Sequence, residues 1–174
     1  MKREKISTEE LARRLAGAKL LTLDVDGVLT DGALHYFEDG TETRVFHVRD
    51  GLGIKMLLGS GFPVAMISAS KTPSISIRGK NLGIPHVHIG VEDKVGVLNG
   101  LCAKVGAEPS EVIHVGDDLN DIPILERVGF PLTVPNAVRE VIDRAIYVTG
   151  KPGGTGAIRE ICELILKARG AWPY

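Results

Sequence analysis

Short apolar runs that alternate with amphipathic segments dominate the pattern of hydrophobic and polar positions along this chain. Continuous apolar runs of this length are typical of strands buried on both faces of a parallel sheet. They lie at residues 20–24, 63–67, 86–89, 112–115, 131–134 and 146–148. Between them, apolar positions at helical spacing predict helices at about 7–17, 50–58, 72–83, 93–105, 122–128, from 136 onward, and 157–167. Strands and helices that alternate in this way are typical of a Rossmann-like, doubly wound α/β fold.

One segment interrupts the alternation directly after the first strand. Residues 33–37 and 43–48 are rich in strand-forming residues, and Glu38-Asp39-Gly40 between them is typical of a β-hairpin turn. We expect this hairpin, at about 33–48, to project from the main sheet. Its aromatic residues Tyr36, Phe37 and Phe46 either form a subunit interface or pack on the parent domain. Asp50 is expected to act as N-cap of the helix that follows.

Length and charge narrow the class of protein. A chain of 174 residues is long enough to bury one substantial core, so we expect a single domain over residues 1–174. Its C-terminal part would be a glycine-rich segment and a helix at about 150–168. With 21 Lys and Arg against 22 Asp and Glu, the net charge is −1, which argues against nucleic acid or an anionic membrane as partner.

The N-terminal segment and the two cysteines indicate in which cellular compartment we expect the protein. No apolar run approaches membrane-spanning length. Residues 7–10, Ser-Thr-Glu-Glu, resemble a capping box and not the apolar core of a signal peptide. Cys102 and Cys162 lie far apart in predicted helices. Buried thiols in a reducing cytoplasm are the simpler interpretation than a disulfide.

Candidate catalytic residues follow four of the predicted strands. In a parallel sheet the carboxyl ends of the strands share one edge, where ligands bind. The polar groups expected there are Asp24 with Asp26, Ser68, the pair Asp93-Lys94, and Asp117 with Asp118. Side chains alternate along an extended chain, so Asp24 and Asp26 point the same way. Two carboxylates this close repel each other unless a proton or cation intervenes, and Mg2+ prefers such oxygen ligands.

These motifs resemble those of the haloacid dehalogenase-like superfamily. The matching residues are Asp24-x-Asp26-Gly27-x-x-Thr30, Ser68, Lys94 and Gly116-Asp117-Asp118-x-x-Asp121. Within that superfamily, three longer segments resemble the 3-deoxy-D-manno-octulosonate 8-phosphate phosphatases: residues 24–32, residues 48–54, and Gly153-Gly154-x-Gly156-Ala157-x-Arg159-Glu160. The resemblance covers about residues 19–166, without an insertion large enough for a cap domain. It implies a cytoplasmic, Mg2+-dependent phosphomonoesterase of lipopolysaccharide biosynthesis that forms homotetramers.

The resemblance also implies roles for single residues. Asp24 would be the nucleophile that forms an aspartyl-phosphate, and Asp26 the general acid and base. Mg2+ would be held by Asp24, Asp117 and the backbone carbonyl of Asp26. Ser68 and Lys94 would stabilise the phosphoryl group. Asp121 would orient Lys94 or a metal-bound water, and whether Asp118 reaches the metal through water stays open.

The same family assigns a set of substrate-binding residues to this chain. They are Asp26, His47, Val48, Arg49, Asp50, Gly51, Lys55, Ser70, Arg78 and Lys94. An arginine suits the carboxylate of a sugar acid because its planar fork binds in a bidentate manner. The alternative for Arg49, Lys55 and Arg78 is that they are ordinary surface charges. The segment 153–156 either cradles phosphate at a helix N-terminus, closes an active site, or is only a turn.

One departure from the family pattern concerns substrate identity. The family usually has Gly-Arg or Gly-Lys after the motif-two hydroxyl, whereas this chain has Ala69-Ser70, followed by Lys71. His47 also replaces the usual Asn. A related nonulosonate phosphate, or another small phosphate ester, is therefore an alternative substrate.

Two other classes of protein fit the sequence less well. A response-regulator receiver domain needs a phosphoacceptor Asp at the end of a middle strand, but Ile67 is followed by Ser68-Ala69-Ser70. A non-catalytic regulatory domain has no use for an intact set of Asp24, Asp26, Lys94 and Asp117. We therefore expect a phosphatase that acts on a small-molecule phosphate ester.

Overall fold

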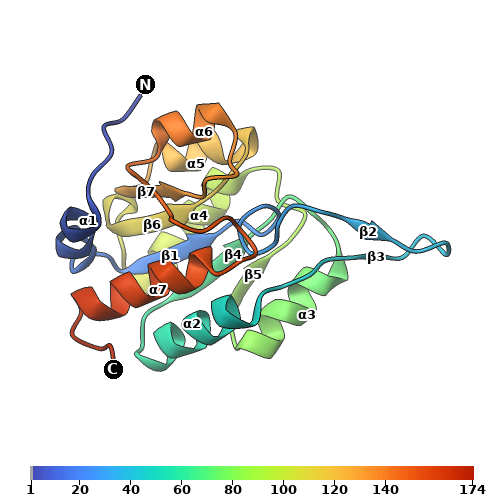
Figure 1. The fold of residues 1–174 in the computed structure, drawn as a ribbon, viewed down its shortest axis with the longest axis horizontal. Helices are drawn as coiled ribbons and strands as arrows, with labels where there is room; N and C mark the ends of the chain where they lie inside the picture. Colours follow the sequence, from blue (N-terminus) through green and yellow to red (C-terminus); the bar gives the residue numbers. More distant parts are fainter. Residues whose placement is uncertain (1) are drawn as a thin grey trace.

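A six-stranded, all-parallel sheet is the centre of the computed structural model, which describes residues 2–174 (Figure 1). The strand order is β5-β4-β1-β6-β7-β8, with β1 paired to β4 on one side and to β6 on the other. The strands are β1 (Leu20–Leu23), β4 (Val64–Ile67), β5 (His86–His88), β6 (Val112–Val115), β7 (Phe130–Thr133) and β8 (Tyr147–Val148). The predicted doubly wound α/β fold is confirmed.

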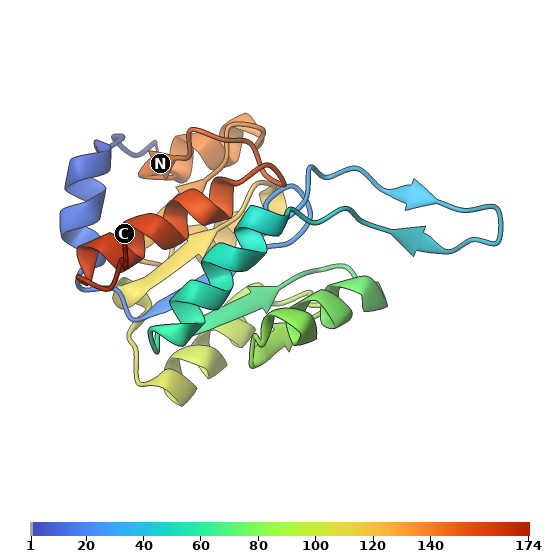
Figure 2. The same ribbon diagram turned by 60° about the horizontal axis from the view of Figure 1, so that its bottom comes forward.

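Helices cover both faces of this sheet. One face carries α1 (Thr8–Leu15), α2 (Val48–Gly59), α3 (Pro73–Leu82) and α7 (Ala157–Ala168). The other carries α4 (Lys94–Val105) and α5 (Ile122–Leu125), with α6 (Arg139–Arg144) beside α5. Single helical turns at Pro109–Glu111 and Leu119–Asp121 complete the connections. In Figure 2, α2 and α7 lie side by side across the sheet, and they share the most extensive contact between any two elements.

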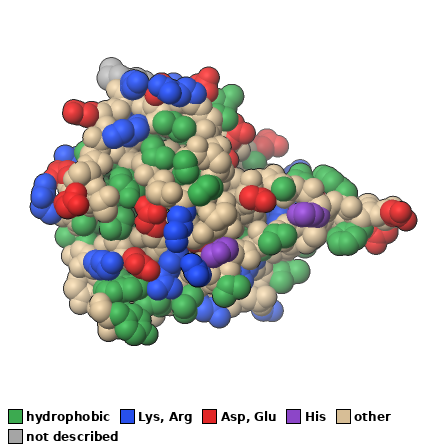
Figure 3. All heavy atoms as spheres, viewed as in Figure 1, with side chains coloured by type: hydrophobic (Ala, Val, Ile, Leu, Met, Phe, Trp, Pro, Cys, Tyr) green, Lys and Arg blue, Asp and Glu red, His purple; other side chains and the backbone are tan. Residues whose placement is uncertain are grey.

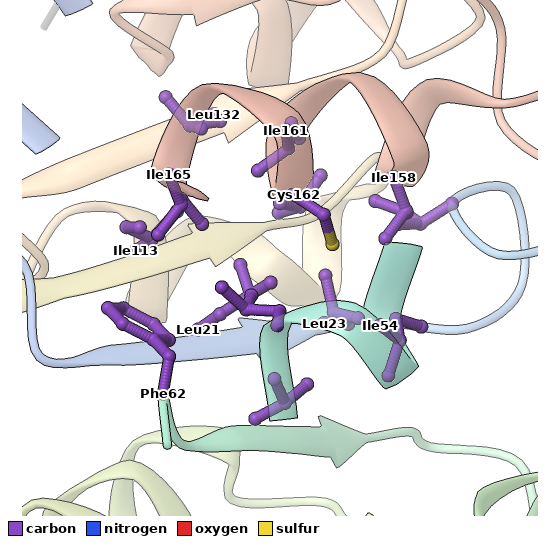
Figure 4. Packing of buried hydrophobic residues seen from close by; sticks show 14 of the residues in the cluster. Leu21, Leu23, Ile54, Phe62, Ile113, Leu132, Ile158, Ile161, Cys162 and Ile165 are labelled. Carbon is purple, nitrogen blue, oxygen red and sulfur yellow. The ribbon is translucent and has the colours of Figure 1, made fainter. Parts of the chain in front are cut away.

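The alternation of side chains along β1 divides the core into two layers. Leu21 and Leu23 pack under α2 and α7, where Figure 4 shows them against Ile161 and Cys162 of α7. Leu20 points to the opposite face, toward α4. Removing an aliphatic side chain of this size from water contributes about 1.5–3 kcal/mol, so a strand buried on both faces anchors the fold.

The structure corrects the expected cap of α2. The helix begins at Val48 with His47 as its N-cap residue, so Asp50 lies inside the first turn. Its carboxylate is buried and accepts hydrogen bonds from the backbone N–H groups of Gly156 (3.2 Å) and Arg159 (2.8 Å). Asp50 therefore caps α7, and not its own helix, because its carboxylate satisfies free N–H groups in the first turn of α7.

The helix expected from Asn136 also begins later, at Arg139. The Asn136 side chain is occupied elsewhere: its amide donates to the carbonyl of Gly27 (2.9 Å) and its oxygen accepts from the N–H of Gly153 (2.8 Å). Asn136 thus ties the C-terminal glycine-rich segment to the loop after β1, which a local helix signal does not reveal.

The hairpin forms and projects from the body of the molecule (Figures 1 and 2). Its ladder is shorter than expected, with β2 at His35–Tyr36 and β3 at Glu42–Thr43. Tyr36 and Phe37 are exposed, whereas Phe46 packs against the main core with the Arg78 guanidinium above its ring. Phe46 therefore packs on the parent domain, whereas a subunit interface at the exposed Tyr36 and Phe37 stays a prediction.

The cysteines and the helix lengths bear on the expected compartment. Cys102 and Cys162 are buried and unpaired, as expected. Within residues 2–174, no helix combines the length and hydropathy that crossing a membrane requires.

Replacing Ile161 with Ala is expected to lower the free energy of unfolding by about 2–5 kcal/mol, because the side chain is fully buried between α7 and the sheet. The matched control Ile77→Ala, on the exposed face of α3, is expected to change it by less than about 0.5 kcal/mol. Urea unfolding followed by circular dichroism measures both. Equal losses for the two variants would contradict this packing.

Candidate active site

A polar cavity of about 200 Å3 opens at the carboxyl ends of β1, β4 and β6. It is lined by Asp24, Asp26, Gly27, Gly32, Ser68, Ala69, Ser70, Asp117, Asp118 and Asn120. The order of the central strands explains this convergence, since β1 lies between β4 and β6 and each ends in a polar group. We call this cavity the acidic pocket.

Lys94 lies beneath the acidic pocket and pairs with two carboxylates. Its Nζ atom lies 3.0 Å from Oδ1 of Asp24 and 2.6 Å from Oδ1 of Asp121, and all three side chains are buried. Lys94 is the first residue of α4, where Asp93 provides the N-cap. Asp121 is held further by the ring of His114, at 3.3 Å, and accepts from the N–H of Asp117 at 3.1 Å.

Asp117 carries a buried oxygen without a partner among the described residues. Its Oδ1 atom makes no hydrogen bond, although it is shielded from solvent. Carboxylate oxygens of Asp24, Asp117 and Asp121 lie within 4.8 Å of one another. An unpaired anionic oxygen inside such a cluster fits a hard divalent cation such as Mg2+. The side chain of Asp26 is not in the cluster, and a metal contact of its backbone carbonyl stays a prediction.

Gly27 is required for this arrangement. It adopts a left-handed conformation (φ 80°), and a Cβ atom there would lie 1.9 Å from Oδ2 of Asp117. Only glycine allows the loop after β1 to approach the Asp117 carboxylate.

Burial and like charges shift the pKa values of these carboxyl groups. Burial, reinforced by the carboxylates of Asp24, Asp121 and Asp118, raises the pKa of Asp117 to about 8. Burial also raises the pKa of Asp24. Asp121 behaves oppositely: although burial disfavours its charge, the side chains of His114 and Lys94 lower its pKa. Asp121 is therefore the permanent anion of the site, whereas Asp24 and Asp117 require a cation or a proton.

A buried arginine that sequence reasoning missed contacts the pocket from behind. The Arg44 guanidinium binds both carboxylate oxygens of Asp26 and donates to Oγ of Ser70 at 3.0 Å. The one available signal was an arginine two residues from Glu42, on the same side of a strand that leads back to the body.

The remaining predicted substrate residues do not line the acidic pocket of the same chain. Val48, Gly51, Lys55 and Arg78 line a separate, mostly apolar depression together with Leu52 and Leu82. No residue lines both cavities. Arg49 is exposed, Asp50 is buried under α7, and His47 offers its carbonyl to Arg78 at 3.2 Å. We call this depression the α2–α3 groove.

The glycine-rich segment supports the loop after β1. The N–H of Gly154 donates to the carbonyl of Val28 (3.1 Å), and a Cβ at Gly153 would collide with the Gly27 carbonyl. At the start of α7, the N–H groups of Gly156 and Arg159 donate to Asp50, as described above. This does not support a phosphate cradle, because those amides are occupied within the chain.

Comparisons with known proteins agree with this geometry. Residues 83–161 match the family model of haloacid dehalogenase-like hydrolases. The 3-deoxy-D-manno-octulosonate 8-phosphate phosphatase KdsC of Escherichia coli K12 is 43% identical over 152 residues, which cover 87% of this chain and 81% of that protein.

Solved structures give the same result. The 3-deoxy-D-manno-octulosonate 8-phosphate phosphatase of Moraxella catarrhalis, in complex with magnesium, phosphate and KDO, is 41% identical, with a TM-score of 0.90 over 94% of each chain. A probable YrbI family phosphatase from Pseudomonas syringae is 47% identical, with a TM-score of 0.90 over 94% of this chain and 93% of that one.

Metal-free protein is expected to lose stability as the pH rises from about 4 to about 8. The folded state raises the pKa of Asp117 to about 8, so it binds a proton that the unfolded chain has already released. Asp117→Asn is therefore expected to lose less stability over this range in EDTA. Addition of Mg2+ at pH 8 should raise the melting temperature of the wild type only. Equal responses of both proteins, measured by differential scanning fluorimetry, would contradict a metal site at Asp117.

Proposed function

We propose a function for this chain from one premise: it belongs to the family of 3-deoxy-D-manno-octulosonate 8-phosphate phosphatases, within the haloacid dehalogenase-like hydrolases. The chain is a Mg2+-dependent phosphatase that hydrolyses 3-deoxy-D-manno-octulosonate 8-phosphate. The observation that carries this proposal is the buried Lys94–Asp24 contact beside the unpartnered oxygen of Asp117. That arrangement needs a cation, and it presents a carboxylate nucleophile to a phosphate ester.

The first half of the reaction transfers the phosphoryl group to the protein. A carboxylate oxygen of Asp24 attacks phosphorus, and the bond from phosphorus to the sugar oxygen breaks. Asp26, on the pocket wall, gives a proton to that oxygen, a contribution of typically 10²–10⁴-fold in rate. The product of this half is an aspartyl-phosphate on Asp24.

The second half returns Asp24 to its free form. Asp26 takes a proton from water, the oxygen of which attacks phosphorus and releases inorganic phosphate from Asp24. Lys94 and the hydroxyl of Ser68 stabilise the negative charge on the phosphoryl oxygens in both halves. Asp121, held by His114, keeps Lys94 in place. Asp118 is exposed at the rim of the acidic pocket, where it would contact the metal only through water.

Mg2+ suits the oxygens of Asp24 and Asp117 and the backbone carbonyl of Asp26. When bound, it neutralises phosphoryl charge, so that an anionic nucleophile can approach an anionic ester.

The active protein is an oligomer, a homotetramer by analogy with its family. Leu34, Tyr36, Phe37 and Val45 leave apolar surface exposed on the projecting hairpin, which Figure 3 shows extending beyond the body. Exposed apolar surface of this kind is typical of subunit interfaces. Each copy is a single domain over residues 1–174, because both core layers share one sheet.

Oligomerisation also accounts for the separation of the two cavities. The acidic pocket holds the groups for the chemistry, whereas Lys55 and Arg78 of the α2–α3 groove suit the carboxylate of a sugar acid. We infer that the groove of one copy completes the acidic pocket of another. The source of the substrate is lipopolysaccharide biosynthesis in the cytoplasm, a reducing compartment that agrees with two unpaired cysteines.

Purified protein with Mg2+ is expected to release phosphate from 3-deoxy-D-manno-octulosonate 8-phosphate in preference to other sugar phosphates. Asp24→Asn is expected to abolish turnover, because the amide is not a nucleophile. A malachite-green screen over sugar and sugar-acid phosphates measures both. If the protein instead prefers a nonulosonate phosphate, the mechanism at Asp24 stands and the proposed substrate is wrong. We would then attribute the different substrate to Ser70, where the family usually has a cation. No turnover of any ester would reject the enzyme function.

Subunit mixing tests the composite site. Asp24→Asn and the double variant Lys55→Ala/Arg78→Ala are each expected to lose about tenfold or more in turnover. Co-expressed, they should recover activity in about one site in four, if copies assemble at random. The control pair, Asp24→Asn with Asp117→Asn, places both lesions in the acidic pocket and should recover nothing. Light scattering that shows a monomer, or equal behaviour of the two pairs, would reject the composite site.

A further inference from the structure

Arg44 is a buried cation at the base of an exposed hairpin. Its side chain is only 3% exposed, although residues on both sides of it, Thr43 and Val45, are accessible. Burying a guanidinium is costly unless its N–H groups are paired. Here they are: Nε and Nη2 bind the two oxygens of Asp26, Nη2 also binds Ser70, and Nη1 binds Glu42.

The contacts of Arg44 place it behind the acidic pocket and not in it. Asp26 and Ser70 both line the pocket wall, whereas Arg44 does not. A fork that grips both oxygens of a carboxylate fixes its rotation as well as its position. Each carboxylate oxygen has two lone pairs, so the Asp26 side chain, about one-third exposed, retains one on each oxygen for the pocket.

Glu42 extends this network across the hairpin. One of its oxygens accepts from Arg44 and from the hydroxyl of Thr72 (2.6 Å), and the other accepts from the hydroxyl of Tyr36 (2.6 Å). Hydrogen bonds to these three side chains lower the pKa of Glu42 to about 2. The anion therefore persists at every physiological pH, and it holds Arg44 between the hairpin and the loop after β4.

We propose that Arg44 is the positioning residue for Asp26, and that the hairpin delivers it to the acidic pocket. Resting on the proposed function, this assigns to the hairpin a part in catalysis within its own chain. Arg44 orients the oxygen of Asp26 that passes a proton to the departing sugar oxygen. It touches neither the substrate nor the reacting atoms.

A double-mutant cycle tests whether Arg44 acts through Asp26. The kcat/KM of the wild type, Arg44→Gln, Asp26→Asn and the double variant is measured on 3-deoxy-D-manno-octulosonate 8-phosphate. Arg44→Gln is expected to lose about 10- to 100-fold, as for other residues that orient a catalytic group. In the Asp26→Asn background the same change is expected to cost less than about threefold. If the Arg44→Gln loss is as large in the Asp26→Asn background as in the wild type, Arg44 does not act through Asp26 and the proposal is overturned.

The leaving group provides a second readout that a purely structural role would not move. The kcat/KM value reports steps up to departure of the leaving group, and p-nitrophenolate departs without a proton. Arg44→Gln is therefore expected to lose much less on p-nitrophenyl phosphate than on the sugar phosphate. Equal losses on both esters would overturn the proposal. No turnover of either ester by the wild type would instead reject the proposed function itself.

Two further variants keep the result interpretable. Arg44→Lys retains the charge but not the bidentate fork, so it should recover part of the activity and replaces Arg44→Gln in the cycle if that variant does not fold. Arg13→Gln, on the exposed side of α1, is the matched control and should behave as the wild type in every assay. Melting temperatures verify that each variant is folded.

Discussion

Repulsion among buried carboxylates is the constraint on which the rest of this structure depends. Asp24, Asp117 and Asp121 come together because β1 and β6 are neighbours in the sheet and end at the same edge. The positive charge of Lys94 offsets the negative charges of Asp24 and Asp121, and His114 adds a further contact to Asp121. The unpartnered oxygen of Asp117 leaves one negative charge for a cation. In the proposed mechanism, that cation lets an anionic nucleophile approach an anionic substrate.

The loop after β1 is held in place from two sides, which keeps these charges together. Gly27 permits the close approach of Asp117, and Asn136 and the glycine-rich segment bind the backbone on one side. On the other side, Arg44 grips the carboxylate of Asp26. Distant parts of the chain therefore converge on a single turn. Such support is what a site needs when its groups must act without rearrangement.

The division of the predicted site into two cavities has a simple physical origin. Residues 48–55 belong to α2, which must bury its apolar side against α7 and the sheet. That packing leaves Lys55 exposed beside the groove, which shares no lining residue with the acidic pocket. The acidic groups are thus concentrated at the sheet edge, and the groove and the hairpin are left exposed on the surface.

Much of this protein was determined by local sequence. Strands and helices followed from apolar periodicity, and Asp24, Ser68, Lys94 and Asp117 could be placed together because each follows a strand of a parallel sheet. The tertiary structure alone decided the partners of Asp50, Asn136 and Arg44. Each of these side chains bonds to a segment remote in sequence, and local patterns carry information only about neighbouring residues.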